Sequence, residues 1–335
     1  MKNVVTLLLI TVLSSGLWNE VSARTGKITG GQAFEMPDWF KASFLEIHND
    51  AREAGEAGKH LMLYMHLENC PYCKRMLDES FFQGANKPFM QKHFDVIDIN
   101  IRGDRSVEWG GGVIYNEKEL AQELKVYATP AILFINAKGQ IVYRTNGYRS
   151  PERLRNVLQY VSERQYGKIT LADYVTQKDI VRYALKKHSA FVSMTDFSRY
   201  DGPLAVIFED PGCSDCAEFH QYTLQHADVV REMKGLKVVR LDAWSNETII
   251  DPAGNKTTPR QWAASLKLDY RPATVLFDNG EEVTRADSQL YHFHYKEMLR
   301  YVAKRLYFEY PTYLIYLAAR QRELLKQGVD IDLGR

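Results

Sequence analysis

Two Cys-x-x-Cys motifs contain all four cysteines of this 335-residue chain. They are Cys70-Pro71-Tyr72-Cys73 and Cys213-Ser214-Asp215-Cys216. Each motif is followed, about sixty residues later, by a proline that opens an apolar run, at Thr129-Pro130 and at Arg271-Pro272. A close cysteine pair with a distant proline, present twice, indicates thiol–disulfide chemistry carried by two copies of one fold.

The spacing of the two halves supports a duplication. Cys213 follows Cys70 by 143 positions, and Pro272 follows Pro130 by 142. The turn Asn279-Gly280 follows Lys138-Gly139 by 141. A nearly constant offset over about a hundred residues indicates a repeat. Its period has the size of a domain and is too long for a solenoid.

Composition limits the functions that we consider. Apolar residues make up 45% of the chain and charged residues 25%, with a net charge of +1. These values are ordinary for a globular protein, and the length is sufficient for two domains with real cores. Because no strong positive charge is present, we expect no nucleic-acid partner and no anionic membrane surface as partner.

The N-terminus resembles a targeting segment, so residues 1–23 are predicted to be a cleaved signal peptide. Lys2 gives a positive start, residues 4–17 are mostly apolar, and Val21-Ser22-Ala23 fits a cleavage site. The alternative is an uncleaved membrane anchor, but the apolar run is shorter than the roughly 20 residues that a span needs. We therefore expect an exported protein that does not span the membrane after cleavage.

Export affects how the cysteines are interpreted, because disulfides persist outside the cytosol. Four cysteines allow three pairings. Pairing within each motif is favoured, since the partners are three residues apart and occupy matching places in the two copies.

Hydrophobic patterning predicts a mixed α/β fold with helices on both faces of each sheet. Strands are expected at 61–65, 94–101, 132–135 and 141–144, and again at 204–208, 238–241, 275–277 and 282–285. Helices are expected from Trp39 to a stop at Gly58, at 74–82, 117–126 and 151–166, and again after Cys216 and at 261–268, 294–308 and 313–327. The three glycines at 110–112 are expected to form a flexible loop.

These elements divide the chain into a first domain at 24–167, a helical linker at 168–200 and a second domain at 201–310. A C-terminal helix and tail occupy 311–335. The mature N-terminus at 24–37 is expected to be loose. Helical character is expected in the linker at 179–187.

Each motif lies where a strand meets a helix, so the first sulfur is at a helix N-terminus. Unpaired amides and the helix dipole favour a thiolate there. Cys70 and Cys213 are therefore the predicted attacking sulfurs. Cys73 and Cys216, one turn further and more buried, are the predicted resolving sulfurs.

Both halves resemble thioredoxin-fold domains. The first half is similar to periplasmic thioredoxins of the SoxW type, through Asp38-Trp39-Phe40, the first motif with Lys74, Thr129-Pro130 and Gly147-Tyr148-Arg149. The second half resembles the same family more loosely. The resemblance implies an α/β class with two thioredoxin-like domains in tandem, cis-prolines at both corners, and electron exchange between periplasmic thiols and disulfides.

The chain departs from thioredoxin in its buried groups. Thioredoxin keeps a buried acid six residues before the first cysteine, whereas this chain has Tyr64 and Ile207 there. Proton transfer then needs another group, and the candidates are Glu68, His66 or water. Arg271 replaces the threonine expected before the second proline, which indicates some divergence of the second copy.

The resulting prediction is an exported thiol–disulfide oxidoreductase that exchanges disulfides with protein partners, acting as a reductant by family analogy. A membrane electron donor is a further candidate partner, and no cofactor or metal is expected. The predicted substrate contacts are Pro71, Tyr72, Thr129, Pro130, Arg271 and Pro272.

Several alternatives stay open at this point. The protein could be a disulfide isomerase or oxidase, or a non-catalytic module that binds a client or a metal. The second disulfide could be purely structural. Four cysteines can hold zinc, and a thiol pair can carry copper(I), but the two pairs belong to separate domains. His292 and His294 are expected to be a surface pair and not a metal site.

Asp215 allows a first prediction. Its negative charge should disfavour a thiolate nearby, so the pKa of Cys213 should be higher than that of Cys70. Alkylation rates measured against pH in variants that keep only one motif test this. A lower apparent pKa at Cys213 than at Cys70 would refute it.

Overall fold

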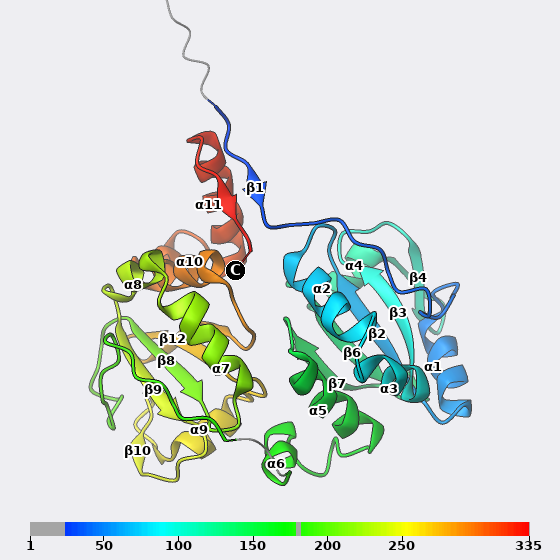
Figure 1. Cartoon of the computed structure of the whole chain (residues 1–335), viewed down its shortest axis with the longest axis horizontal. Coiled ribbons are helices and arrows are strands. Elements are labelled where there is room, and N and C mark those ends of the chain that lie inside the picture. Colours follow the sequence, from blue (N-terminus) through cyan, green and yellow to red (C-terminus); the bar gives the residue numbers. More distant parts are fainter. Residues whose placement is uncertain (1–23, 179–181, 335) are drawn as a thin grey trace, which may run out of the picture.

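The computed structural model describes residues 24–178 and 182–334. It contains two α/β domains side by side, followed by a C-terminal helix (Figure 1). Each domain has a four-stranded sheet with helices on both faces, which confirms the predicted fold class. The predicted signal segment at 1–23 lies outside the described residues.

The sheet of domain 1 has the strand order β3-β2-β6-β7. β2 pairs with β3 in parallel and with β6 in antiparallel orientation, and β6 and β7 form the hairpin predicted around Lys138-Gly139. Every residue of the central strand β2 is buried. The strands are β2 (His60–His66), β3 (Phe94–Asn100), β6 (Ala131–Ile135) and β7 (Ile141–Asn146).

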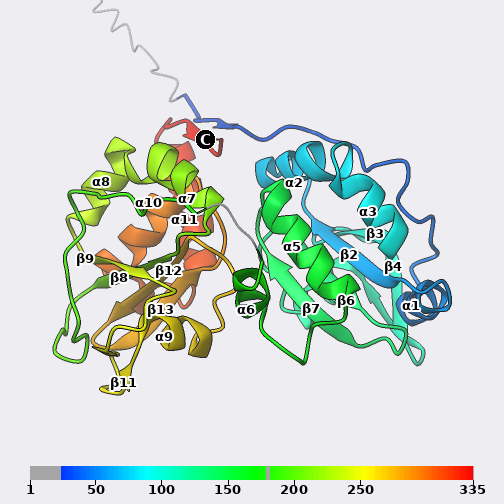
Figure 2. The ribbon, with the colours of Figure 1, turned by 60° about the horizontal axis from the view of Figure 1, so that its bottom comes forward.

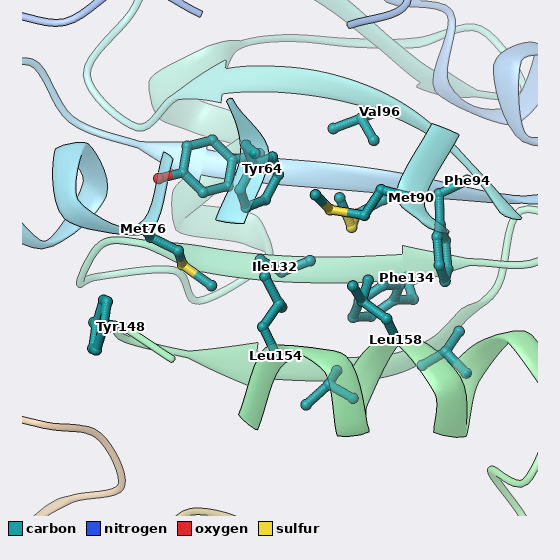
Figure 3. Close-up of a cluster of buried hydrophobic side chains, with 14 of the residues drawn as sticks. Tyr64, Met76, Met90, Phe94, Val96, Ile132, Phe134, Tyr148, Leu154 and Leu158 are labelled. Carbon is teal, nitrogen blue, oxygen red and sulfur yellow. The ribbon is translucent and has the colours of Figure 1, made fainter. Parts of the chain in front are cut away.

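Alternation along β2 divides the core of domain 1 into two layers, because successive side chains point to opposite faces of a strand. Met62 and Tyr64 join the layer under three helices that includes Met76 and Leu154 (Figure 3). Leu63 joins the opposite layer. The first layer is covered by α2 (Pro71–Met76), α3 (Asn86–His93) and α5 (Pro151–Ser162), and the second by α1 (Ile47–Glu56) and α4 (Glu117–Glu123).

Domain 2 repeats this plan with the strand order β13-β12-β8-β9. Its strands are β8 (Leu204–Glu209), β9 (Lys237–Asp242), β12 (Ala273–Asp278) and β13 (Glu281–Ala286). One face is covered by α7 (Ser214–Glu218), α8 (Ala227–Met233) and α10 (His292–Ala303), and the other by α9 (Pro259–Ser265). In both copies a π-helical turn continues the helix after the second cysteine, at Leu77–Phe81 and Phe219–Leu224.

Several short elements were not predicted. The glycines at 110–112 lie at the tip of a hairpin of β4 (Ser106–Gly110) and β5 (Val113–Asn116), and β10 (Ile249–Ile250) pairs with β11 (Lys256–Thr257). A 3-10 turn at Leu306–Phe308 follows α10, which ends at Ala303 and not at 308 as predicted. The C-terminal helix α11 (Tyr313–Lys326) agrees with the sequence prediction.

The two ends of the described chain meet, so the N-terminal segment is less loose than predicted. β1 (Ile28–Thr29) pairs in parallel with β14 (Ile331–Asp332) beside α11. From there the segment crosses to domain 1, where Phe34 and Met36 pack against its core. It thereby connects the C-terminal helix of the chain to the first domain.

The helix predicted from Trp39 to Gly58 starts later than expected, at Ile47, whereas its end at Glu56 agrees with the predicted stop. Trp39 and Phe40 pack on the α2 side of the sheet, and the Trp39 Nε1 donates to the Phe81 carbonyl at 3.1 Å. Leu45 packs on the opposite side, with a φ of 62°. Because the apolar residues of this segment serve both faces of the sheet, the chain passes around its edge and the helix begins only at Ile47.

The linker differs from the prediction as well. Its only helix in the described residues is α6 (Leu171–Thr176). Of the helix predicted at 179–187, residues 179–181 lie outside the described part, and 182–187 are not helical. Further along, the Val192 amide bonds to the Val238 carbonyl at 2.9 Å, and Phe197 is buried in domain 2. These contacts attach the last part of the linker to domain 2.

An ion pair joins the two domains, and its two residues occupy equivalent positions in the two copies. Arg75, just after the first motif, donates two bonds to Glu218, just after the second, at 2.7 and 2.9 Å. Its guanidinium also lies 4.0 Å from the centre of the Tyr148 ring. α5 and α6 lie on the side of domain 1 that faces domain 2 (Figure 2). The helices that carry the two motifs are thus held against each other.

The Arg75–Glu218 pair gives a stability prediction. In Arg75→Met, Glu218 loses both donated bonds in a largely buried site, so the free energy of unfolding should fall by about 2 kcal/mol. Urea unfolding measures this. The matched control is Arg52→Met, which breaks an exposed pair with Glu56 and should cost less than about 0.5 kcal/mol. Equal losses in the two variants would contradict the role assigned to Arg75.

Candidate active site

The first motif is placed by the start of α2. Cys70 is the N-cap residue, and its Sγ accepts a hydrogen bond from the Cys73 amide at 3.1 Å. Pro71 occupies the first helical turn, where its missing amide is not needed. Asn69, just before the motif, has a φ of 57°, which makes the sharp turn from strand to helix.

The Thr129-Pro130 corner lies against Cys70. The peptide bond before Pro130 is cis. The Thr129 hydroxyl donates to the Cys70 Sγ at 3.4 Å, and the Thr129 carbonyl oxygen is 3.8 Å from the same sulfur. Tyr127 and Ala128, just before the corner, are exposed, whereas Thr129 is half-buried and Pro130 is buried. The structure therefore brings the predicted nucleophile and the predicted partner-binding loop together.

Both cysteine pairs are joined within their own motifs. The disulfides are Cys70–Cys73 and Cys213–Cys216, with Cα atoms 5.2 and 5.4 Å apart. This confirms the pairing favoured from spacing. In the described residues no group of three or more His, Cys, Asp or Glu side chains forms a possible metal site.

Tyr64 occupies the place where thioredoxin has its buried acid. Its hydroxyl donates to the Cys73 carbonyl at 3.0 Å, and burial raises its pKa well above the usual value. Tyr64 therefore supports the backbone of α2 and does not supply a carboxylate. Of the alternative proton carriers, Glu68 is exposed, whereas His66 is buried with its Nε2 3.4 Å from an Asp98 oxygen.

The second motif has the same local construction. Cys213 is the N-cap of α7 and its Sγ accepts from the Cys216 amide at 3.0 Å, while the bond before Pro272 is cis. The Arg271 side chain turns inward and donates to the Leu268 and Tyr270 carbonyls at 2.8 and 2.7 Å. It is 5% exposed, so it does not present its charge to solvent at the corner.

The order of burial differs between the motifs, which corrects the prediction that each resolving cysteine is the more buried one. Cys70 is 7% exposed and Cys73 fully buried, as predicted. Cys213 is only 1% exposed, whereas Cys216 is 7% exposed. The leading cysteine of the second motif lies beside the domain interface, where Arg153 of α5 donates to the Gly212 carbonyl at 3.0 Å.

Tyr72, a predicted substrate contact, is engaged with domain 2. Its ring stacks on Tyr291 with centroids 4.4 Å apart. Its hydroxyl accepts from the Tyr291 amide at 2.8 Å and is 3.1 Å from the His294 Nδ1. Burial lowers the pKa of His294 to about 4, so the ring is neutral near pH 7. Its Nδ1 can then accept a hydrogen bond from the Tyr72 hydroxyl. In this arrangement Tyr72 fixes the interface.

The histidines predicted to form a surface pair are in fact separated and packed. His294 meets Tyr72, whereas His292 stacks on His226 with ring centroids 4.1 Å apart. Both are partly buried between helices. Alternate positions at the start of α10 place the two rings on different sides of the helix.

Sequence reasoning missed two polar side-chain pairs near the motifs. Arg75–Glu218 could have been found by aligning the copies at an offset of 143, where the charges are opposite. Glu209 and His220 form a second pair at 2.8 Å, and both side chains are almost fully buried. A glutamate ending an otherwise apolar strand was the available signal for it.

An open cavity of about 890 Å³ lies between the domains. Its walls include Tyr143 and Tyr160 of domain 1, and Trp244 and Arg271 of domain 2. None of the cysteines is among the described residues that line it. The cavity therefore adjoins the second corner without reaching either disulfide, and the chemistry is located at the motifs.

Within the described residues, no helix combines the length and the apolar character needed to cross a bilayer. No curated protein sequence matches this chain.

Three solved structures are similar to parts of the chain, all with low TM-scores. A thioredoxin-fold protein from Helicobacter pylori is 20% identical, with 42% of this chain and 91% of that chain covered and a TM-score of 0.36. A disulphide isomerase from Xylella fastidiosa Temecula1 is 20% identical, with 39% and 99% covered and a TM-score of 0.29. A putative disulphide-isomerase from Bacteroides thetaiotaomicron is 27% identical, with 39% and 96% covered and a TM-score of 0.28.

The family match is more extensive. A model of the thioredoxin-like domain matches residues 47–162 and 191–303, which together are more than half of the chain. Each matched region contains one Cys-x-x-Cys disulfide and one cis-proline corner, a combination that supports thiol–disulfide oxidoreductase activity. The chain therefore belongs to the thioredoxin-like domain family, with two copies of the domain in tandem.

Proposed function

We propose that this protein is an exported thiol–disulfide oxidoreductase that acts on protein partners through Cys70. The observation that carries the proposal is the contact between the Cys70 Sγ and Thr129, beside the exposed residues Tyr127 and Ala128. The second motif has the same parts, but its leading cysteine is 1% exposed, against 7% for Cys70. Domain 1 is thus the better placed of the two to meet a foreign disulfide.

The helix start accounts for the reactivity of Cys70 in the reduced protein. As N-cap of α2, its sulfur accepts the Cys73 amide, which stabilises a thiolate more than a thiol. The Thr129 hydroxyl adds a second donor. A thiolate is the attacking form in disulfide exchange, so both bonds favour Cys70 as the nucleophile.

The exchange then proceeds in two balanced steps. The Cys70 thiolate attacks one sulfur of the partner disulfide, forming a mixed disulfide and releasing the other partner sulfur as a thiolate. Cys73 loses its proton and attacks the Cys70 sulfur, which forms the Cys70–Cys73 disulfide and frees the second partner sulfur. The partner gains two electrons and the protein loses two. An external dithiol must then restore the reduced protein, and a membrane electron donor is the source that we propose.

The corner supplies a way to hold the partner. Pro130 has no amide hydrogen, so the free backbone groups at this corner are those of Thr129. We propose that Thr129 pairs with an extended segment of the partner beside its cysteine, with Pro71 and Pro130 in contact with the same segment. Tyr72 does not contact the partner segment directly, because its ring is packed against Tyr291 of domain 2.

The burial of Cys213 favours a second candidate role for domain 2. With Cys213 1% exposed, domain 2 in this arrangement serves as a supporting or client-binding module, and a foreign disulfide meets Cys213 less readily than Cys70. Arg271 and Pro272 are then structural parts of the interface. An isomerase or oxidase role of the first motif uses the same contacts, and its direction depends on the redox partner.

Insulin reduction with dithiothreitol as electron source separates these roles. Cys70→Ser removes the nucleophile and should lower the rate at least about 100-fold. Cys213→Ser should keep the rate within about threefold of the parent, since the less exposed motif is not needed. Activity that depends on Cys213 and survives loss of Cys70 would overturn the assignment. A parent protein that neither reduces nor isomerises disulfides would favour the binding role.

A further inference from the structure

We propose that domain 1 completes the second redox site, with Arg153 and Arg149 acting as positioning residues that supply the positive charge needed to hold a thiolate at Cys213. The proposal rests on the thiol–disulfide chemistry proposed above and extends it to the second motif. Neither arginine belongs to domain 2. The reactivity of Cys213 is then a property of the docked pair of domains.

Arg153 makes the direct contact. It lies in the first turns of α5, and its Nη2 donates to the carbonyl of Gly212, the residue just before Cys213, at 3.0 Å. Standard covalent geometry then keeps the guanidinium within about 8 Å of the Cys213 Sγ. At such a distance a partly buried unit charge acts on a thiolate more strongly than it would across bulk water.

Arg149 acts through the side chain of Tyr270. Its guanidinium lies 4.2 Å from the centre of the Tyr270 ring, and it donates to the Asp287 carbonyl at 3.1 Å. The Tyr270 hydroxyl donates to Asp215, inside the second motif, at 2.8 Å. Arg149 is 4% exposed, so its charge is placed in the interface and not in solvent.

Domain 2 alone surrounds its motif with an excess of negative charge. Its buried cation nearby is Arg271, whose Nε is 3.6 Å from an Asp210 oxygen. Burial raises the pKa of Asp287 to about 6, which leaves it mostly ionised at pH 7. The other charged or titratable groups of domain 2 around this site are Asp215, Asp269, Glu218, Tyr270, and the Glu209–His220 pair with Arg240 behind it.

Domain 1 supplies the compensating cations. Arg75 binds Glu218, Arg149 covers Tyr270, and Arg153 binds the backbone beside Cys213. These three contacts come from α2, the loop before α5 and α5 itself. A thiolate forming at Cys213 would otherwise face four aspartates of its own domain with one buried arginine.

The effect operates in one direction. Domain 2 contacts Tyr72 of the first motif through Tyr291 and through His294, whose pKa burial lowers to about 4, and its Glu218 is offset by Arg75. Domain 1 contacts the second motif through arginines. Docking should therefore change the acidity of Cys213 much more than that of Cys70.

The redox consequence follows from the electron balance. A dithiol partner delivers two electrons to the Cys213–Cys216 disulfide, breaking the S–S bond and forming two thiols, and Cys213 then releases its proton to solvent. Any group that stabilises the resulting thiolate favours the reduced form of the motif. Loss of Arg153 should move the equilibrium with dithiothreitol toward the disulfide by up to about tenfold.

The direct test is titration of Cys213 in a protein that has no other cysteine, made with Cys70→Ser, Cys73→Ser and Cys216→Ser. Ultraviolet absorbance of the thiolate is recorded against pH, with the all-serine protein subtracted to remove the tyrosines. Arg153→Gln should raise the pKa of Cys213 by about one unit. Arg149→Gln should also raise the pKa of Cys213.

Two further variants separate charge from structure. Arg155→Gln removes a neighbouring charge of α5 that lies over Phe89, away from domain 2, and should leave the pKa of Cys213 within about 0.2 units of the parent. Arg153→Lys keeps the charge and should restore most of the shift, even if the docking is weaker. Equal pKa values in Arg153→Gln and Arg155→Gln, or no recovery in Arg153→Lys, would overturn the proposal. The titration needs no turnover, so its failure differs from that of the insulin assay.

Discussion

Polar contacts between the two domains fix where the two redox motifs lie relative to each other. Arg75 of domain 1 binds Glu218 of domain 2 with two hydrogen bonds, next to the two redox motifs. Arg75 also donates to Glu79 and Glu218 also accepts from Gln289, so the pair belongs to a partly buried network that favours one relative placement of the domains. In that placement Arg153 of α5 binds the backbone next to Cys213.

Duplication followed by divergence explains why one fold gives two different sites. The two copies share the N-cap cysteine, the disulfide and the cis-proline. They differ in the residues that face the other copy: Tyr72 corresponds to Asp215, and Arg75 to Glu218, each at an offset of 143. Substitutions at an interface change exposure and charge without disturbing the sheet. The first copy keeps the more exposed nucleophile, while the second has become part of a charged interface.

Local chemistry was predictable from the sequence, and long-range placement was not. The strands, the disulfide pairing and the proline corners follow from hydrophobic period and from motif spacing, which act over a few residues. The start of the first helix was predicted too early because the apolar residues from Trp39 to Leu45 pack on opposite faces of one sheet. The pairing of β1 with β14 joins the two ends of the chain, and no local pattern predicts it. The contact between Arg153 and the Gly212 carbonyl beside Cys213 was not predictable either, since Arg153 lies in the other domain.

The central claim is that Cys70 is the sulfur that reacts with other proteins. Expressing the Cys73→Ser variant in its native compartment traps partners as mixed disulfides, because the resolving step is removed. The account predicts stable adducts at Cys70, seen as mass-shifted complexes that disappear on reduction, and few or none in a matched Cys216→Ser variant. Adducts formed mainly at Cys213, or none at Cys70, would contradict it.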